Sequence, residues 1–227
     1  MLRRLRFWSG LVPLGAFLLI HLILNERALA GPAAFENAVF HARVPARCVL
    51  DALLVLTPLV VHAALGLWVV FARKSGVSPS PYSASIRTAM RVTGVLAGGF
   101  IAMHLTEVRL RLAGAHLGGG EIATILSEDL SSTSHGIPVA ALAYLGGTGC
   151  VVFHFAVGLW GAFATSRAGR ASLRARQWLA YCAMALGLSV WTGYADVVVF
   201  HATGARLVGF GAHAEAARNA PCPPSDP

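Results

Sequence analysis

Two pairs of segments in the sequence nearly repeat each other, and each segment carries one histidine in an apolar run. His62-Ala-Ala-Leu-Gly-Leu-Trp68 is matched by His154-Phe-Ala-Val-Gly-Leu-Trp160, and Gly15-Ala-Phe-Leu-Leu-Ile-His21-Leu is matched by Gly98-Gly-Phe-Ile-Ala-Met-His104-Leu. An imidazole in hydrocarbon is costly, so an intramembrane histidine is a functional-site candidate that needs a partner. Four of them in two matched pairs predict two sites, each taking one imidazole from either half of the repeat. A haem iron ligated on both faces suits two facing imidazoles in an apolar bundle.

The composition is that of a membrane protein. Hydrophobic residues make up 56% of the chain and charged residues 12%. The apolar segments hold about 20 residues or not far short, enough to span ~30 Å of hydrocarbon as helices, and they lack the alternation of barrel strands. We expect an all-α integral membrane protein over residues 1–210, with the first four of five helices forming a haem-binding bundle and residues 211–227 forming a disordered tail. The five expected spans are 10–25, 49–72, 92–112, 137–165 and 178–204.

Charge placement predicts the orientation. If five helices cross the membrane, eleven of the 18 basic residues and none of the 10 acidic residues lie on the side of the N-terminus. By the positive-inside rule that side is cytoplasmic, and the C-terminus is then outside. The eleven residues are Arg3, Arg4, Arg6, Arg73, Lys74, Arg87, Arg91, Arg167, Arg170, Arg174 and Arg176.

The basic balance of +8 does not indicate a nucleic-acid-binding protein. The excess lies in short clusters beside the expected spans, with no basic domain to form a footprint on nucleic acid. Topology alone explains such clusters, and anionic lipid or a docked cytoplasmic partner is the other explanation.

The N-terminal segment has two interpretations. Its arginines, apolar run and Ala28-Leu29-Ala30-Gly31 resemble a cleaved signal peptide. Against cleavage, Pro13 and His21 interrupt the apolar run. Glu26 and Arg27 also lie just before the possible cleavage site. Because the repeat also gives His21 a role, we expect the segment to be retained.

The remaining cysteines and histidines carry no comparable signal. The four cysteines form neither a C-x-x-C pair nor a C-x-x-C-H attachment motif, so any haem is expected to be a non-covalent b-type group. Five histidines fall in expected loops or near the ends of segments, and we expect them to be surface or capping residues. They are His41, His116, His135, His201 and His213.

Depth in the membrane predicts how the four histidines pair. His21 is five residues from Glu26 and His104 is three from Glu107, whereas His62 and His154 lie deeper in their spans. Equal depth permits pairing across a bundle, so we expect His21 with His104 in an outer site and His62 with His154 in an inner site. Small residues near these histidines would let a flat macrocycle or another helix approach the backbone, although ordinary helix packing explains them equally well. They are Gly15, Gly98, Gly66 and Gly158, while Trp68 and Trp160 suit an interfacial belt.

At these residues the sequence resembles a known family, the dihaem cytochrome b membrane anchors of succinate:quinone oxidoreductases. The resemblance is to the five-helix, single-anchor type found with menaquinone-using succinate dehydrogenases and fumarate reductases, and it covers residues 3 to about 165. The matching residues are Arg3-Arg4-Leu5, Gly10-Leu11-Val12-Pro13, His21-Leu22 and Asn25, then Leu56-Thr57-Pro58-Leu59 and His62, then Arg91-Val92-Thr93-Gly94 and His104, then Phe153-His154-Phe155 and Gly158-Leu159-Trp160.

The resemblance implies a multi-pass subunit of a bacterial cytoplasmic membrane that is not catalytic alone. A flavoprotein subunit with FAD and an iron–sulfur subunit would deliver electrons through two b haems to menaquinone. The basic cytoplasmic face would dock the iron–sulfur subunit, and Arg91 would pair with a propionate of the inner haem. Quinone chemistry needs a proton donor or acceptor near the outer haem, and the candidates are Glu36, Asn25, Glu107 and Arg109.

One departure bears on the direction of the reaction. Fumarate reductases of this family carry a glutamate two residues before the fourth-span histidine, where this chain has Val152. The departure favours succinate oxidation. Two other functions stay open: the dihaem anchor of another respiratory enzyme, of the formate dehydrogenase or nitrate reductase type, and a haem-free transporter or assembly protein that uses the histidines as a proton relay.

Overall fold

A computed structural model describes residues 2–42, 52–71, 82–114, 121–166 and 172–208. Over these ranges the chain is helical apart from turns and one isolated β-bridge between Ser134 and Ile137. The helices include five that are long and apolar enough to cross a membrane: Phe7–Ala30, Leu53–Phe71, Ala84–Glu107, Val139–Thr165 and Leu173–Thr203. The expected all-α, five-span, multi-pass architecture is therefore confirmed, while the expected tail at 211–227 lies outside the described residues.

Helical segments follow one another along the first two spans. The first span joins α1 (Leu2–Ser9), a π-helical turn η1 (Gly10–Leu14), α2 (Gly15–Asn25) and a 3₁₀ turn η2 (Glu26–Ala30). The second joins a π-helical turn η3 (Ala52–Leu56) to α5 (Thr57–Phe71).

Both π-helical turns lie at prolines. Pro13 is inside η1, and Pro58 is the second residue of α5, directly after η3. A proline has no N–H to donate to the carbonyl four residues earlier, so the α-helical ladder is interrupted there. π-helical turns are a usual result of such an interruption.

The remaining spans are single long helices, α6 (Ala84–Gly114), α8 (Val139–Thr165) and α10 (Leu173–Thr203). α6 begins eight residues before the expected span at 92, and α10 begins five before 178. The sequence placed Arg87, Arg91, Arg174 and Arg176 in loops, but they lie in the first turns of these helices. The difference arises because a helix continues past the hydrocarbon boundary while its residues keep good helix propensity.

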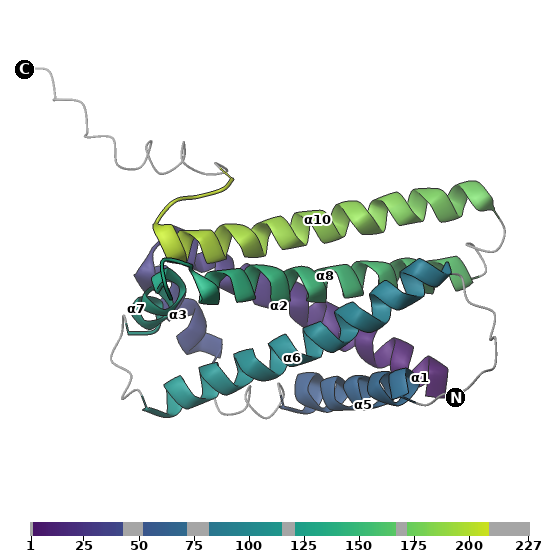
Figure 1. The fold of residues 1–227 in the computed structure, drawn as a ribbon, viewed down its shortest axis with the longest axis horizontal. Coiled ribbons are helices and arrows are strands. Elements are labelled where there is room, and N and C mark those ends of the chain that lie inside the picture. Colours follow the sequence, from purple (N-terminus) through teal and green to yellow (C-terminus); the bar gives the residue numbers. More distant parts are fainter. Residues whose placement is uncertain (1, 43–51, 72–81, 115–120, 167–171, 209–227) are drawn as a thin grey trace, which may run out of the picture.

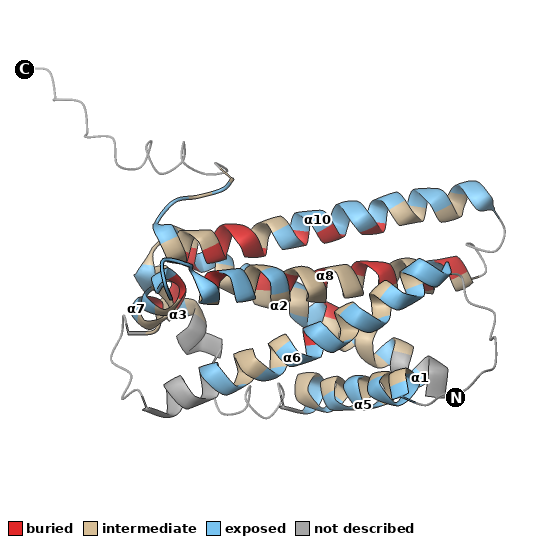
Figure 2. Ribbon diagram, in the orientation of Figure 1, coloured by how far each residue is buried: buried red, intermediate tan, exposed pale blue. Residues whose placement is uncertain are grey.

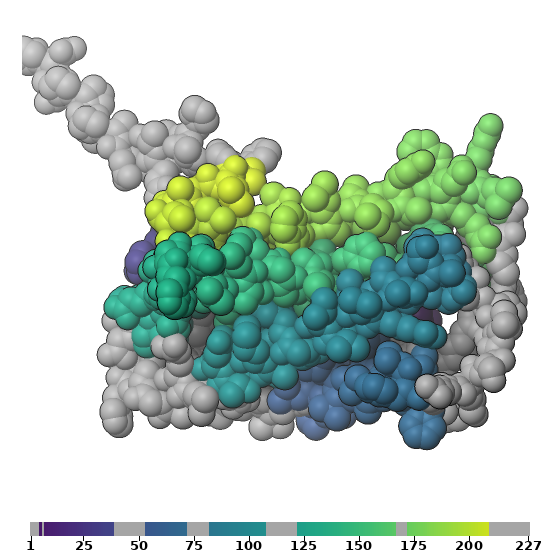
Figure 3. All heavy atoms as spheres, viewed as in Figure 1, coloured from purple at the N-terminus to yellow at the C-terminus, as the bar shows by residue number. Residues whose placement is uncertain are grey.

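The bundle is most tightly packed around α8. α10 and α6 both run along α8, and α5 runs along α1 (Figure 1). Buried residues gather on α8 and on the part of α10 that faces it, whereas α5 has none (Figure 2). In the view of Figure 3, side chains of α6 form the surface below α8 and α10, and α5 lies at the lower edge of the molecule. Large exposed apolar side chains such as Trp68 and Phe71 suit contact with lipid.

Two short helices cover one end of the bundle, which we call the capped end. They are α3 (Pro32–Ala42) and α7 (Glu121–Ser131), and they lie beside the end of α10 (Figure 1). A buried cluster of Ala28, Phe35 and Ala123 holds them together. The N-terminus and the starts of α6 and α10 lie at the opposite end, which we call the N-terminal end (Figure 1).

Candidate functional site

The structure brings the four intramembrane histidines together as two pairs. The ring centroids of His21 in α2 and His104 in α6 are 6.0 Å apart, and their planes are inclined by 69°. Those of His62 in α5 and His154 in α8 are 6.2 Å apart, inclined by 85°. The first pair is the one nearer the capped end. These are the two pairs that the equal-depth argument predicts.

The separation of each pair fits a metal held from both sides. A metal–imidazole bond of about 2.1 Å places the ring centroid roughly 3.2 Å from the metal, so two rings on opposite sides stand roughly 6.4 Å apart. The observed 6.0 and 6.2 Å agree with that requirement. Both pairs therefore have the spacing for bis-histidine ligation.

Each pair offers two protein ligands to a metal. Among the described residues, no group of three or more His, Cys, Asp or Glu is placed to hold a metal. A structural or catalytic zinc ion takes three or four protein ligands. A haem brings its own four nitrogens and needs two axial ligands, which is what each pair offers.

A glycine on a neighbouring helix lies against each inner histidine. A Cβ atom at Gly10 would overlap the ring of His62, and a Cβ at Gly94 would lie 2.9 Å from Cε1 of His154. Any side chain at these two positions would displace the imidazole. The resemblance motifs contain both glycines, but nothing in the sequence places either of them at the inner pair.

The four glycines that the sequence singled out have different surroundings. A Cβ at Gly15 would meet the ring of Phe155 at 2.5 Å, so this glycine serves helix packing. At Gly66, Gly98 and Gly158 the structure has nothing within 4 Å of an added Cβ. Close approach of a macrocycle at these three positions stays a prediction.

A phenylalanine one turn before each outer histidine lies parallel to its ring. Phe17 and His21 have centroids 5.2 Å apart and planes 18° apart, while Phe100 and His104 have 6.0 Å and 17°. The two phenylalanines occupy equivalent positions in the sequence repeat, and residues four apart share a helix face. This second element of the repeat was readable in the sequence, where the Phe-x-x-x-His spacing occurs twice.

Tyrosines from two other helices complete the surroundings of the outer pair. The hydroxyl of Tyr144 in α8 lies 3.1 Å from Nδ1 of His104 and donates to Oε2 of Glu107 at 3.0 Å. Tyr194 in α10 has its ring 6.3 Å from that of His21 and donates to the carbonyl oxygen of Leu18 at 2.7 Å. No sequence pattern pointed to either tyrosine, because the repeat has no equivalent of Tyr144.

Three of the four residues proposed for quinone chemistry have an internal hydrogen-bond partner in the structure. Nδ2 of Asn25 donates to the carbonyl oxygen of His21 at 2.7 Å, and Oε1 of Glu36 accepts from the backbone N–H of Ala123 at 3.0 Å. Glu107 accepts from Tyr144, as described above. The side chain of Arg109 lies outside the described part of the structure.

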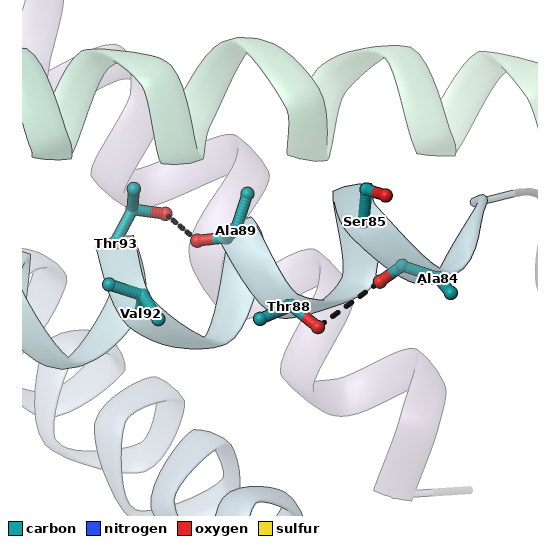
Figure 4. A pocket seen from close by; sticks show the side chains of 6 residues that line it. All are labelled: Ala84, Ser85, Thr88, Ala89, Val92 and Thr93. Atoms are coloured by element: carbon teal, nitrogen blue, oxygen red, sulfur yellow. Dashed lines mark hydrogen bonds between the residues drawn. The ribbon is translucent and has the colours of Figure 1, made fainter.

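Arg91 is exposed on α6 near the N-terminal end. A shallow groove of about 690 Å³ runs along the same turns of the helix and contains none of the four paired histidines. The hydroxyls of Thr88 and Thr93 bond to carbonyl oxygens of their own helix, so the groove is mostly apolar (Figure 4). Its lining residues are Ala84, Ser85, Thr88, Ala89, Val92 and Thr93.

One expectation about the remaining histidines is wrong. His201 was expected at the surface but is buried in α10, with 6% of its area exposed. Its Nδ1 lies 3.0 Å from the hydroxyl of Ser127 in α7, and its ring packs 5.8 Å from that of Phe35 in α3. The sequence misled because the helices of the cap were not foreseen. His135 is exposed as expected; the side chain of His41, and all of His116 and His213, lie outside the described residues.

Aromatic contacts join the end of α8 to the start of α10. Nε1 of Trp160 donates to the carbonyl oxygen of Arg176 at 3.3 Å, and its ring lies 5.4 Å from that of Tyr82.

Val152 is 2% exposed in an apolar cluster with Leu22 and Tyr194. Trp68 is 65% exposed, as a residue of an interfacial belt would be.

Comparison with known proteins gives one relevant relative. The chain is 32% identical over 161 residues to the protein named succinate dehydrogenase cytochrome b558 subunit of Bacillus subtilis (strain 168). The match covers 70% of this chain and 75% of the relative. No family model matches the chain, and no solved structure matches it.

Proposed function

The chain belongs to the family of succinate dehydrogenase cytochrome b subunits and serves as a membrane anchor of that enzyme, and we propose that it holds two b haems on the paths that electrons take to a quinone. A cytochrome b subunit implies haem b. The number of haems, their ligands and the quinone are our proposal.

The observation that carries the proposal is the spacing of the two histidine pairs. Centroid separations of 6.0 and 6.2 Å are those of two imidazoles on opposite sides of one metal. A proton relay would require hydrogen-bonded neighbours, but it would not require two pairs at this common separation. The spacing therefore favours ligation over the relay that the sequence left open.

The chain's residues hold and surround the bound groups. His62 and His154 would hold the inner haem, and His21 and His104 would hold the outer haem. When bound, each haem would carry one electron at a time on the way from an iron–sulfur subunit to the quinone. The apolar helices exclude water and small ions from both sites, and this dry surrounding is one of the protein's means of tuning the carriers.

The N-terminal end is proposed to be cytoplasmic. Arg87, Arg91, Arg174 and Arg176 lie there at the starts of α6 and α10, in keeping with the positive-inside rule. Arg91 would pair with a propionate of the inner haem. The same basic face would dock the iron–sulfur subunit, which in turn carries the flavoprotein, in a bacterial cytoplasmic membrane.

The capped end is proposed to hold the quinone site. Asn25 and Glu107 lie on the helices of the outer pair and contact its surroundings, and Glu36 lies on α3 at the same end of the bundle. Of the three, Glu36 lies on α3, which covers the bundle end, and it is the candidate for proton exchange with the quinone. Val152, in place of a buried glutamate, offers no group for transmembrane proton transfer, which supports succinate oxidation as the direction.

The test is haem quantification on the purified full chain, expressed with adequate haem supply. A dithionite-minus-oxidised spectrum of the wild type should give two b-type haems per chain. His62→Ala should lose the inner haem and His21→Ala the outer haem, while His135→Ala, at an exposed histidine outside both pairs, should keep two.

Two results would overturn the proposal. A colourless wild-type chain would leave the histidines without haem and would revive the relay. Equal loss of both haems in His135→Ala and His62→Ala would mean that haem content reports general misfolding and not ligation. If the wild type binds two haems and the variants behave as expected, succinate-driven menaquinone reduction by the assembled enzyme is the next assay.

A further inference from the structure

A hydrogen-bonded chain joins one outer histidine to an exposed carboxylate. His104 Nδ1 lies 3.1 Å from the hydroxyl oxygen of Tyr144, which donates to Oε2 of Glu107 at 3.0 Å. We propose that Tyr144 and Glu107 are positioning residues that fix the tautomer of His104 and lower the reduction potential of the outer haem. This inference rests on the proposed function, because it assumes that His104 ligates a haem.

The direction of each hydrogen bond follows from the chemistry of the groups. An ionised carboxylate only accepts hydrogen bonds, so the hydroxyl hydrogen of Tyr144 must point to Glu107. The hydroxyl oxygen can then only accept from His104, which must carry its hydrogen on Nδ1. In a neutral imidazole the other nitrogen, Nε2, keeps its lone pair and is the one available to a metal.

The same chain transmits negative charge towards the ligand. A carboxylate that is linked to the N–H of a metal-bound imidazole raises the basicity of that ligand. A more basic axial ligand stabilises the oxidised, more positive iron, so the potential falls. Glu107 lies three residues after His104 on α6, one turn along the same face, which keeps its charge close to the ligand.

Packing holds the tyrosine in place for this role. The ring of Tyr144 lies at 84° to that of His104 with centroids 5.6 Å apart, and at 88° to that of Phe100 with centroids 5.4 Å apart. Phe100 is itself stacked on His104. The rings of Tyr144 and Phe100 pack against the imidazole and against each other, so the hydroxyl meets Nδ1 without relying on a flexible side chain.

The opposite ligand of the outer pair provides an internal comparison. Tyr194 lies beside His21, but its hydroxyl donates to the backbone carbonyl oxygen of Leu18 at 2.7 Å. The carbonyl of Leu18, on the helix of His21, is neutral. Glu26 lies near Tyr194, but the hydroxyl of Tyr194 bonds to Leu18. Of these two tyrosines, Tyr144 is therefore the one whose hydroxyl links a histidine to a carboxylate.

The experiment is a redox titration of the full chain with its haems bound, comparing wild type with Tyr144→Phe. The outer haem is identified as the component that remains in His62→Ala. We expect Tyr144→Phe to raise the reduced-to-oxidised ratio of the outer haem at a fixed poise by at least threefold, which corresponds to about 30 mV for a one-electron couple. The inner haem should not shift, and Tyr194→Phe is the matched control that should leave both potentials unchanged.

A second variant covers the possibility that Tyr144→Phe disturbs folding. Glu107→Gln changes an exposed side chain and keeps all three rings, and it should shift the outer haem in the same direction, while Glu107→Asp should restore part of the wild-type value. Two bound haems with an unshifted outer potential in Glu107→Gln would overturn this inference and leave the proposed function standing. A wild type without haem would overturn both.

Discussion

The close approach of α6 to the inner pair at Gly94 makes a quantitative prediction. In Gly94→Ala, the new methyl group would lie 2.9 Å from Cε1 and 3.3 Å from Nδ1 of His154. Carbon atoms in contact prefer about 3.5–4.0 Å, so the imidazole must retreat by roughly 0.6–1.1 Å or α6 must move. A binding constellation tolerates displacements of about 0.5 Å, so the inner haem site should be damaged.

The stability of the chain should change less than its haem affinity. Overpacking costs about 1–3 kcal/mol, and replacing a helical glycine by alanine returns about 1 kcal/mol of helix propensity. The difference leaves the variant destabilised by about 0–2 kcal/mol, so it should still fold. Disturbing a group that orients a metal ligand typically weakens binding by about 10–100-fold. We expect the affinity for the inner haem to fall by a similar factor.

The assay is haem titration of the purified chain together with redox difference spectra. Gly94→Ala should bind the outer haem normally and the inner haem at least tenfold more weakly. Gly99→Ala is the matched control, because Gly99 is exposed on the same helix and has nothing within 4 Å of an added Cβ. Five residues turn an α-helix by about 140°, so Gly99 faces away from His154.

One result would refute this reasoning. If Gly94→Ala binds both haems with wild-type affinity and unchanged spectra, His154 does not depend on the bare backbone of α6. If Gly99→Ala loses the inner haem to the same extent, the effect belongs to α6 as a whole and not to the contact with the ligand.

Three further changes test other contacts. In Gly147→Ala a Cβ would overlap the ring of Phe100; the outer-haem spectrum should change and stability fall by about 1–3 kcal/mol, while Gly146→Ala, with open space, should do neither. Asp196→Ala removes the buried acceptor of two backbone N–H groups and should cost about 1–3 kcal/mol; a wild-type Tm would contradict this, and Asp196→Asn should recover part of the loss. Glu36→Gln keeps a hydrogen-bond acceptor for α7, whereas Glu36→Ala removes it and should lower stability by about 0.5–2 kcal/mol. A loss of quinone reduction in both variants indicates proton exchange by Glu36. A loss in Glu36→Ala alone indicates only the structural contact.

The sequence by itself determined the architecture and the residue types of the candidate site. Apolar runs of spanning length are a local property of the chain, so five helices could be counted without knowing how they pack. The repeat marked His21, His62, His104 and His154, and their depth within each run predicted which two lie at the same level. Depth survives packing because each helix rises by a fixed amount per residue.

Only the tertiary structure decided what surrounds those histidines. Which residue meets an imidazole depends on the rotation and crossing of whole helices, and neither is encoded in a single helix. Gly94 and Gly10 became contacts of the inner pair in this way, and Tyr144 came from α8 to link His104 with Glu107. The cap of α3 and α7 buried His201 for the same reason. Spacing along a helix is set by the sequence, but a contact between helices forms only when the bundle packs.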